Sequence, residues 1–179
     1  ESSKSSDANL KFFNSDGGES GACGNGTRCV AKLISEETKA ERIILSTLNG
    51  NLESKILDKN LVTTEIGKAK LQWNEIPLSE KLDTKNLNIR ITDINNKEHL
   101  GGTAVNVGNP HIVFFVNEIE NFNIEKIGPE IENHKIFPEK CNVTIAKIIN
   151  KNLIKVKVWE RGAGLTKACG TAACATAFA

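Results

Sequence analysis

The 179-residue sequence lacks several features that mark common classes of protein. It has no apolar run near the roughly 18 residues that a membrane-spanning helix needs. Its formal net charge is only +1, so it also lacks the basic excess typical of nucleic-acid-binding proteins. We therefore expect neither nucleic acid nor a membrane as a partner. The length suits one ordinary domain or two small ones.

Methionine is also absent, and the chain begins with Glu1. It stops at Ala179, in the middle of an apolar pattern with helical character. From these two observations we expect a fragment that lacks both ends of the natural protein.

Cysteine is present in an odd number, which argues against a closed disulfide framework. The five residues are Cys23, Cys29, Cys141, Cys169 and Cys174. Their spacings are not those of the usual zinc knuckles, so we expect no metal site. Free thiols favour a reducing compartment, and we expect a cytoplasmic protein.

The order of predicted elements is similar in two parts of the chain, which we take as halves at 1–75 and 76–179. Each half contains strands, a glycine-rich turn, a Cys-Gly pair and a helix start, as a duplicated domain would. Apolar spacing predicts helices from Gly24 to about Glu37 and from Thr171 onward. A short solvated helix, interrupted at Gly128-Pro129, is predicted over 124–134. Strands are predicted at 10–14, 41–46, 51–57, 61–67, 88–94, 102–107 and 111–116, with a hairpin formed by 142–149 and 152–160.

The two Cys-Gly pairs, in ACGNG (22–26) and ACGTA (168–172), each precede a predicted helix. The first N–H groups of a helix have no partners within it and favour negative charge. A thiol at this position ionises more easily, and the glycine after it lets a ligand approach the backbone. Each turn could therefore bind a carboxylate and present a thiol to it.

Two such thiols could invert a stereocentre without a cofactor. One thiolate would remove the hydrogen next to a carboxylate, and the opposite thiol would return a proton. Helix N–H groups would stabilise the charge that develops on the carboxylate. We expect the remaining three cysteines, Cys29, Cys141 and Cys174, to be small core residues.

These residues resemble the diaminopimelate epimerase family. The stretch NSDGGESGACGNGTRC (14–29) is similar to the first active-site motif of that family, and ERGAGLTKACGT (160–171) to the second. GNPH (108–111) and CNV (141–143) also stand where the family has motifs. The resemblance covers nearly the whole chain. It implies an isomerase of lysine biosynthesis that interconverts LL- and meso-diaminopimelate without cofactor, by two-base proton transfer at the α-carbon.

The resemblance also implies a fold and a set of site residues. The fold would be α+β, with two pseudo-symmetric halves, each a curved antiparallel sheet wrapped around a central helix, and a site in the cleft between them. Cys23 and Cys169 would be the acid–base pair, tuned by His111 and Glu160 respectively. The reacting carboxylate would be held by the backbone of Gly24, Asn25, Gly170 and Thr171. The rest of the substrate would be held by Asn14, Asn109, Asn142, Glu160 and Arg161.

Some positions depart from the family pattern. Leu165 stands where Glu is common, Ala172 where Gly is common, and the approach to the first cysteine is Ser20-Gly21-Ala22. Two alternative functions stay open: a proline or hydroxyproline racemase, and a non-enzymatic thiol redox sensor. The racemases usually have Asp-Arg-Ser-Pro in the second motif, where this chain has Glu-Arg-Gly-Ala. A homodimer is also left open.

Overall fold

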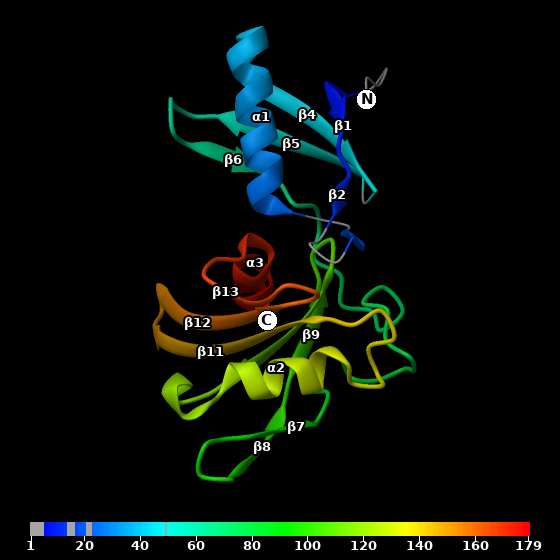
Figure 1. The fold of residues 1–179 in the computed structure, drawn as a ribbon, viewed down its shortest axis with the longest axis vertical. Helices are drawn as coiled ribbons and strands as arrows, with labels where there is room; N and C mark the ends of the chain where they lie inside the picture. The colour runs from blue at the N-terminus through cyan, green and yellow to red at the C-terminus, as the bar shows by residue number, and fades with distance from the viewer. Residues whose placement is uncertain (1–5, 14–16, 21–22, 49) are drawn as a thin grey trace. The chain divides into compact units, whose positions relative to one another are not determined.

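The chain forms two compact units, Glu1–Lys68 (unit 1) and Ala69–Ala179 (unit 2). The computed structural model describes residues 6–13, 17–20, 23–48 and 50–179. Each unit combines a sheet with helices (Figure 1), which confirms the predicted α+β class. The boundary of the predicted halves, 1–75 and 76–179, stays a prediction.

Unit 1 contains a four-stranded sheet in the order β1-β4-β5-β6. Strand β1 is parallel to β4, and the other neighbours are antiparallel. The four strands are Ala8–Asn9 (β1), Arg42–Thr47 (β4), Gly50–Ile56 (β5) and Val62–Thr64 (β6). A separate pair of short antiparallel strands is formed by Phe12–Phe13 (β2) and Glu19–Ser20 (β3).

Helix α1 (Gly24–Thr38) packs against this sheet. Thr27 and Ala31, one turn apart, are its buried residues, as expected of a helix with a single face against a core. Ala31 packs in one cluster with Ile43 and Leu45 of β4. This packing determines which face of α1 lies against the sheet.

Unit 2 is built on a five-stranded sheet in the order β13-β12-β11-β10-β9. Strands β10 and β11 are parallel, and the other neighbours are antiparallel. The strands are Thr103–Asn106 (β9), Pro110–Phe115 (β10), Asn142–Asn150 (β11), Leu153–Glu160 (β12) and Gly164–Thr166 (β13). Outside this sheet lie the antiparallel pair Ile89–Thr92 (β7) and Glu98–Gly101 (β8), and a 3₁₀ turn at Ile119–Asn121.

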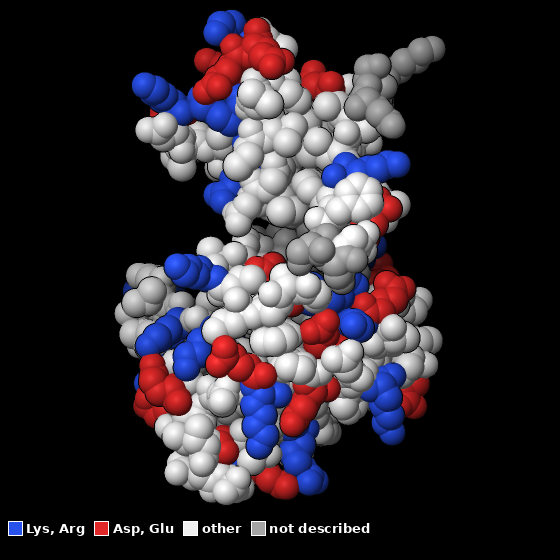
Figure 2. All heavy atoms as spheres, viewed as in Figure 1, with Lys and Arg blue, Asp and Glu red and all other residues white. Residues whose placement is uncertain are grey.

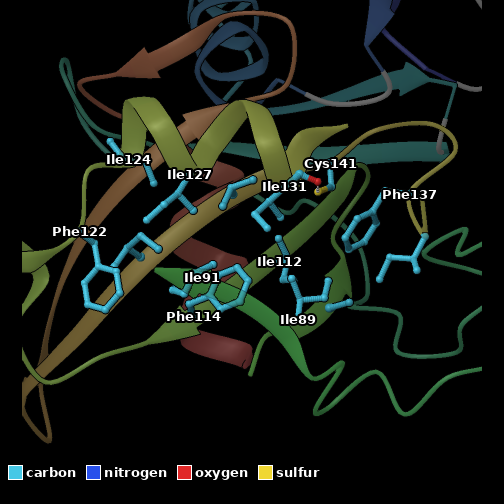
Figure 3. Packing of buried hydrophobic residues seen from close by; sticks show 14 of the residues in the cluster. Ile89, Ile91, Ile112, Phe114, Phe122, Ile124, Ile127, Ile131, Phe137 and Cys141 are labelled. Atoms are coloured by element: carbon cyan, nitrogen blue, oxygen red, sulfur yellow. Dashed lines mark hydrogen bonds between the residues drawn. The ribbon is translucent and has the colours of Figure 1, made fainter. Parts of the chain in front are cut away.

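Two helices cover opposite faces of the sheet in unit 2 (Figure 1): α2 (Ile124–Glu132) and α3 (Gly170–Phe178). Side chains alternate between the faces along each strand. Figure 3 shows Ile112 on the side of α2, where it belongs to the main core cluster together with Ile127. The next residue back along β10, His111, therefore faces α3. The two faces thus differ in character: the α2 face is apolar, and the α3 face carries polar residues.

Figure 2 shows basic and acidic side chains mixed on the face of unit 2 that it presents. Several are paired across neighbouring strands and turns, such as Lys147 with Glu118 at 2.7 Å. Exposed pairs of this kind contribute little to stability.

The predicted helix that begins at Gly24 is confirmed by α1, and the predicted hairpin of 142–149 and 152–160 is confirmed by β11 and β12. The prediction for 124–134 was wrong in two respects, because α2 runs through Pro129 without interruption and buries one face. Proline removes one hydrogen bond within the helix, and the buried isoleucines of α2 stabilise it against the sheet instead. Strands β8 and β13 were not predicted; each is only a few residues long and depends on pairing with a neighbour.

Candidate active site

The first Cys-Gly turn begins helix α1, as the sequence predicted. Cys23 is the N-cap residue, with extended backbone angles (φ −146°, ψ 97°). Its Sγ accepts a hydrogen bond from the N–H of Gly26 at 3.4 Å. Its carbonyl oxygen accepts two further bonds from Thr27, from the N–H at 2.9 Å and from the hydroxyl at 2.8 Å. The sulfur therefore replaces the oxygen that usually caps a helix.

The residues after Cys23 leave the helix start accessible. A Cβ added at Gly24 would meet no described atom within 4 Å, so a ligand could approach the backbone there. Asn25 is exposed, and its side-chain oxygen accepts a bond from Arg28 at 2.7 Å. Asn14, predicted to bind substrate, lies outside the described residues.

The second Cys-Gly turn begins helix α3 in the same way. Cys169 is the N-cap residue and has backbone angles close to those of Cys23 (φ −135°, ψ 111°). Its Sγ lies 3.3 Å from the hydroxyl oxygen of Thr171. Gly170 is exposed, and an added Cβ would again meet no described atom within 4 Å. Both predicted helix starts are thus confirmed as local structures.

The environment of Cys169 favours the protonated thiol. Burial raises the pKa of Cys169 to about 11, and the negative charge of Glu160 adds to this shift, while the Thr171 hydroxyl and the Ala172 N–H oppose it. The sequence predicted a thiol that ionises easily because it caps a helix. At Cys169 that prediction was wrong, because loss of hydration outweighs the donors at the helix start.

Three of the predicted site residues form a row across the sheet of unit 2. His111 on β10 pairs with Asn142 on β11. Val143 pairs with Trp159, so Asn142 lies level with Glu160 on β12. Residues in register across neighbouring strands point to the same face, which here is the face covered by α3. The fold therefore brings residues far apart in sequence beside the start of that helix.

His111 is fully buried and uncharged at neutral pH. Burial lowers the pKa of His111 to about 3, and the positive charge of Arg161 contributes. Its Nε2 donates to the side-chain oxygen of Asn109 at 2.8 Å. Its Nδ1 and the hydroxyl of Thr144, on the next strand, have no hydrogen-bond partner among the described residues. The sequence predicted that His111 tunes Cys23; the two belong to different units, and this pairing stays a prediction.

Asn142 connects β10 to the turn that follows β12. Its amide nitrogen donates to the carbonyl of Pro110 at 2.9 Å, and its amide oxygen accepts the N–H of Arg161 at 3.0 Å. The guanidinium of Arg161 donates to the carbonyl of Glu139 at 2.7 Å. Arg161 is thereby held at both its backbone and its side chain.

Glu132 was not predicted, although it supports the turn between β12 and β13. Only 6% of it is exposed. One carboxylate oxygen accepts the indole N–H of Trp159 at 2.7 Å, and the other accepts the N–H of Gly162 at 3.1 Å. A Cβ at Gly128, one turn earlier on α2, would lie 2.3 Å from Trp159. The signal in the sequence was a charged residue next to the apolar stripe of α2.

Thr166 on β13 was also missed. Its hydroxyl donates to Oε1 of Glu160 at 2.5 Å. Its pairing with Val158 places it on the same sheet face as Glu160, diagonally across from it. The sequence carried no signal for this contact, because β13 itself was not predicted.

The other three cysteines behave differently from one another. Cys141 is fully buried, and its thiol donates to the carbonyl of Ile131 at 3.7 Å. Burial raises its pKa well above the usual value. Cys29 and Cys174 are exposed. The prediction of core packing therefore holds for Cys141 and was wrong for Cys29 and Cys174, which lie on the solvent side of their helices.

Leu165 and Ala172, the two positions of the second motif that depart from the family pattern, differ in burial. Ala172 is fully buried in α3, so its methyl group is accommodated in the packing. Leu165 is 50% exposed and precedes Thr166 on β13, so it points to the opposite face from Thr166. Within the described residues, no group of histidine, cysteine or carboxylate side chains could hold a metal ion, and no helix is long and apolar enough to cross a membrane.

Solved structures share this fold at low sequence identity. A hydroxyproline epimerase from Agrobacterium vitis matches with a TM-score of 0.66 and 15% identity, covering 98% of this chain and 55% of that one. The phenazine biosynthesis protein of the PhzF family from Bacillus anthracis matches with a TM-score of 0.56 and 12% identity, covering 98% and 62%. The chain therefore has the fold that these two proteins share.

The particular family follows from the sequence. The profile of the family described as diaminopimelate epimerase matches residues 1–72 and 103–179, and the chain belongs to that family. A diaminopimelate epimerase from Pelagibacter ubique is 68% identical over 176 residues, covering 98% of this chain and 64% of the relative. One from Afipia carboxidovorans is 44% identical over 172 residues, covering 95% and 59%. The chain thus spans roughly 60% of the length of these relatives.

Proposed function

We propose that this chain carries the two acid–base thiols of a diaminopimelate epimerase, which interconverts LL- and meso-diaminopimelate in lysine biosynthesis. The observation that carries the proposal is that Cys23 and Cys169 both cap a helix, each followed by glycine, within the ranges that the family profile matches. The substrate is inferred from the name shared by the relatives.

The helix starts would hold the reacting carboxylate. The backbone N–H groups of Gly24 and Asn25, and of Gly170 and Thr171, lie in the first turns of α1 and α3. Such groups stabilise negative charge. Removal of the α-hydrogen shifts charge onto the carboxylate, and donors placed in advance lower the barrier to that step.

The resting state of Cys169 follows from its surroundings. Cys169 is protonated at neutral pH, because its pKa of about 11 lies well above 7. In the direction where Cys23 acts as the base, the Cys23 thiolate takes the α-proton and Cys169 gives its own proton to the opposite face of the carbon. In the reverse direction the Cys169 thiolate takes the proton and the Cys23 thiol returns one.

The remaining polar residues would bind the distal part of the substrate. Diaminopimelate carries two carboxylates and two ammonium groups, so it needs both donors and acceptors. Arg161 can form a bidentate contact with a carboxylate. We assign the other contacts to Asn14, Asn109, Asn142 and Glu160, and propose that His111 tunes Cys23.

The proposed chemistry needs no cofactor, because thiols and helix N–H groups supply both the proton transfer and the charge stabilisation. We further propose a small-molecule substrate as the partner and a cytoplasmic location, with a homodimer left open.

The test is solvent deuterium exchange by the full-length protein in the presence of reductant. We expect α-deuterium to enter diaminopimelate, and neither proline nor hydroxyproline. Exchange into proline or hydroxyproline would instead establish a racemase of the other kind. A redox sensor would exchange none of the three, and that result would overturn the proposed function.

A further inference from the structure

A hydroxyl on the neighbouring strand contacts the Glu160 carboxylate. The Thr166 hydroxyl donates to Oε1 of Glu160 at 2.5 Å. Glu160 pairs with Gly164 and Val158 pairs with Thr166, so the two polar side chains lie diagonally on one face of the β12–β13 pair. The contact therefore follows from the strand register and not from two mobile surface side chains that meet by chance.

Cys169 follows β13 closely in the chain. Strand β13 ends at Thr166, and Cys169 follows three residues later as the first residue of the α3 turn. The thiol contacts the Thr171 hydroxyl at 3.3 Å and interacts with the Glu160 carboxylate. Glutamate has three rotatable side-chain bonds, so its charge stays near one sulfur only if a second contact restrains it.

We propose that Thr166 is a positioning residue: its hydroxyl holds the Glu160 carboxylate toward the Cys169 thiol. The catalytic role of Thr166 rests on the proposed two-thiol function. The position of the Glu160 carboxylate beside the Cys169 sulfur is independent of that function and can be tested without substrate.

A matched threonine in the same sheet separates this role from a general role in strand stability. Thr103 lies on β9, the opposite edge strand, and is half-buried like Thr166. Its hydroxyl also donates a hydrogen bond, to the carbonyl of Lys85 at 2.9 Å. Replacing either residue with valine removes one hydroxyl donor from an edge strand, but only Thr166 has Glu160 as its partner.

The experiment measures alkylation by iodoacetamide in the full-length protein between pH 7 and 10, with each cysteine read separately by mass spectrometry. Only the thiolate reacts, so the rate follows the ionised fraction. In Thr166→Val the carboxylate is free to turn away, and we expect Cys169 to react roughly 3- to 10-fold faster at a given pH, since one pKa unit changes the ionised fraction tenfold. Thr166→Ser and Thr103→Val should react like the unchanged protein, and Cys23 should keep its rate in every variant.

Glu160→Gln extends the test and does not depend on Thr166→Val folding. It should accelerate alkylation of Cys169 as much as Thr166→Val does, and the double variant should add nothing, because both changes remove one interaction. If Thr166→Val does not fold, Thr166→Ala takes its place. An unchanged Cys169 rate in the folded Thr166 variant would overturn the positioning role, even where Glu160→Gln accelerates the reaction. Failure of the unchanged protein to exchange deuterium would instead overturn the proposed function and leave this readout intact.

Discussion

The two Cys-Gly helix starts have the same backbone but different surroundings. At Cys23 the sulfur accepts a backbone N–H, and the residue lies in a unit whose described polar contacts near the turn are local. At Cys169 the sulfur lies beside the Thr171 hydroxyl and the Glu160 carboxylate, which Thr166 holds in turn. Two turns with the same residue pattern therefore place their thiols beside different described neighbours.

The largest expected effect comes from removing either thiol. Cys23→Ala and Cys169→Ala should each lower the rate of diaminopimelate inversion by more than about 10⁴-fold, because the two groups act as a unit. The measurement is the inversion rate in the full-length protein. Cys29→Ala and Cys174→Ala are matched controls on α1 and α3, both exposed, and should keep near-normal rates. Near-normal inversion by Cys23→Ala or Cys169→Ala would contradict the claim that inversion needs both thiols.

The second prediction concerns Glu132, which supports the turn between β12 and β13. Glu132→Gln leaves one amide oxygen for the two N–H donors of Trp159 and Gly162. A buried donor without a partner costs about 1–3 kcal/mol, so the free energy of unfolding should fall by that amount in urea titrations. Glu130→Gln makes the same change on the exposed side of α2 and should alter it by less than about 0.5 kcal/mol. Equal effects of the two variants would show that Glu132 is not a support of the turn.

The third prediction uses the buried imidazole of unit 2. The pKa of His111 is about 3 in the folded protein, below the usual 6.5, so protons bind the unfolded state more readily. The neutral His111 imidazole therefore contributes fully to the free energy of unfolding above pH 6.5, and this contribution is lost as the pH falls from there toward 3. Between pH 6.5 and 5 the loss should be roughly 1–2 kcal/mol. His111→Gln should lack this part of the pH dependence in urea titrations, and an unchanged pH dependence would contradict a buried neutral His111.

The smallest expected effect sharpens the comparison at Cys169 itself. The Thr171 hydroxyl lowers the pKa of Cys169, against the raising effects of burial and Glu160. Thr171→Val should therefore slow the alkylation of Cys169 by about threefold, opposite in sign to the effect expected for Thr166→Val. Thr176→Val, also buried on α3 with its hydroxyl on the Ala172 carbonyl, should leave the rate unchanged. Faster alkylation in Thr171→Val would show that this hydroxyl does not act on the sulfur.

Local signals in the sequence were sufficient for the elements that carry the thiols. Helix α1 was predicted from apolar spacing, and the β11–β12 hairpin from two strand-like runs on either side of Asn150-Lys151. Both Cys-Gly pairs were predicted to begin helices, and both do.

The surroundings of the thiols could not be predicted in the same way. The contact between Thr166 and Glu160 depends on the pairing of a three-residue strand, and Glu132 reaches Gly162 only because α2 packs beside β12. The easily ionised thiol expected at Cys169 was wrong because burial, which depends on tertiary packing, outweighs the helix start. Spacing along the chain predicts which thiols react, whereas the pKa of Cys169 depends mainly on its burial in the folded protein.

The central claim is that two different thiols serve the two faces of one carbon. The most direct test is inversion of LL-diaminopimelate in heavy water under initial-rate conditions, with deuterium measured separately in the product and in the recovered substrate. With two bases, the group that takes the proton is not the group that returns one, so the new meso product should carry α-deuterium while the recovered LL isomer stays almost unlabelled. Early deuterium in both isomers would mean that a single base serves both faces, and would contradict the account.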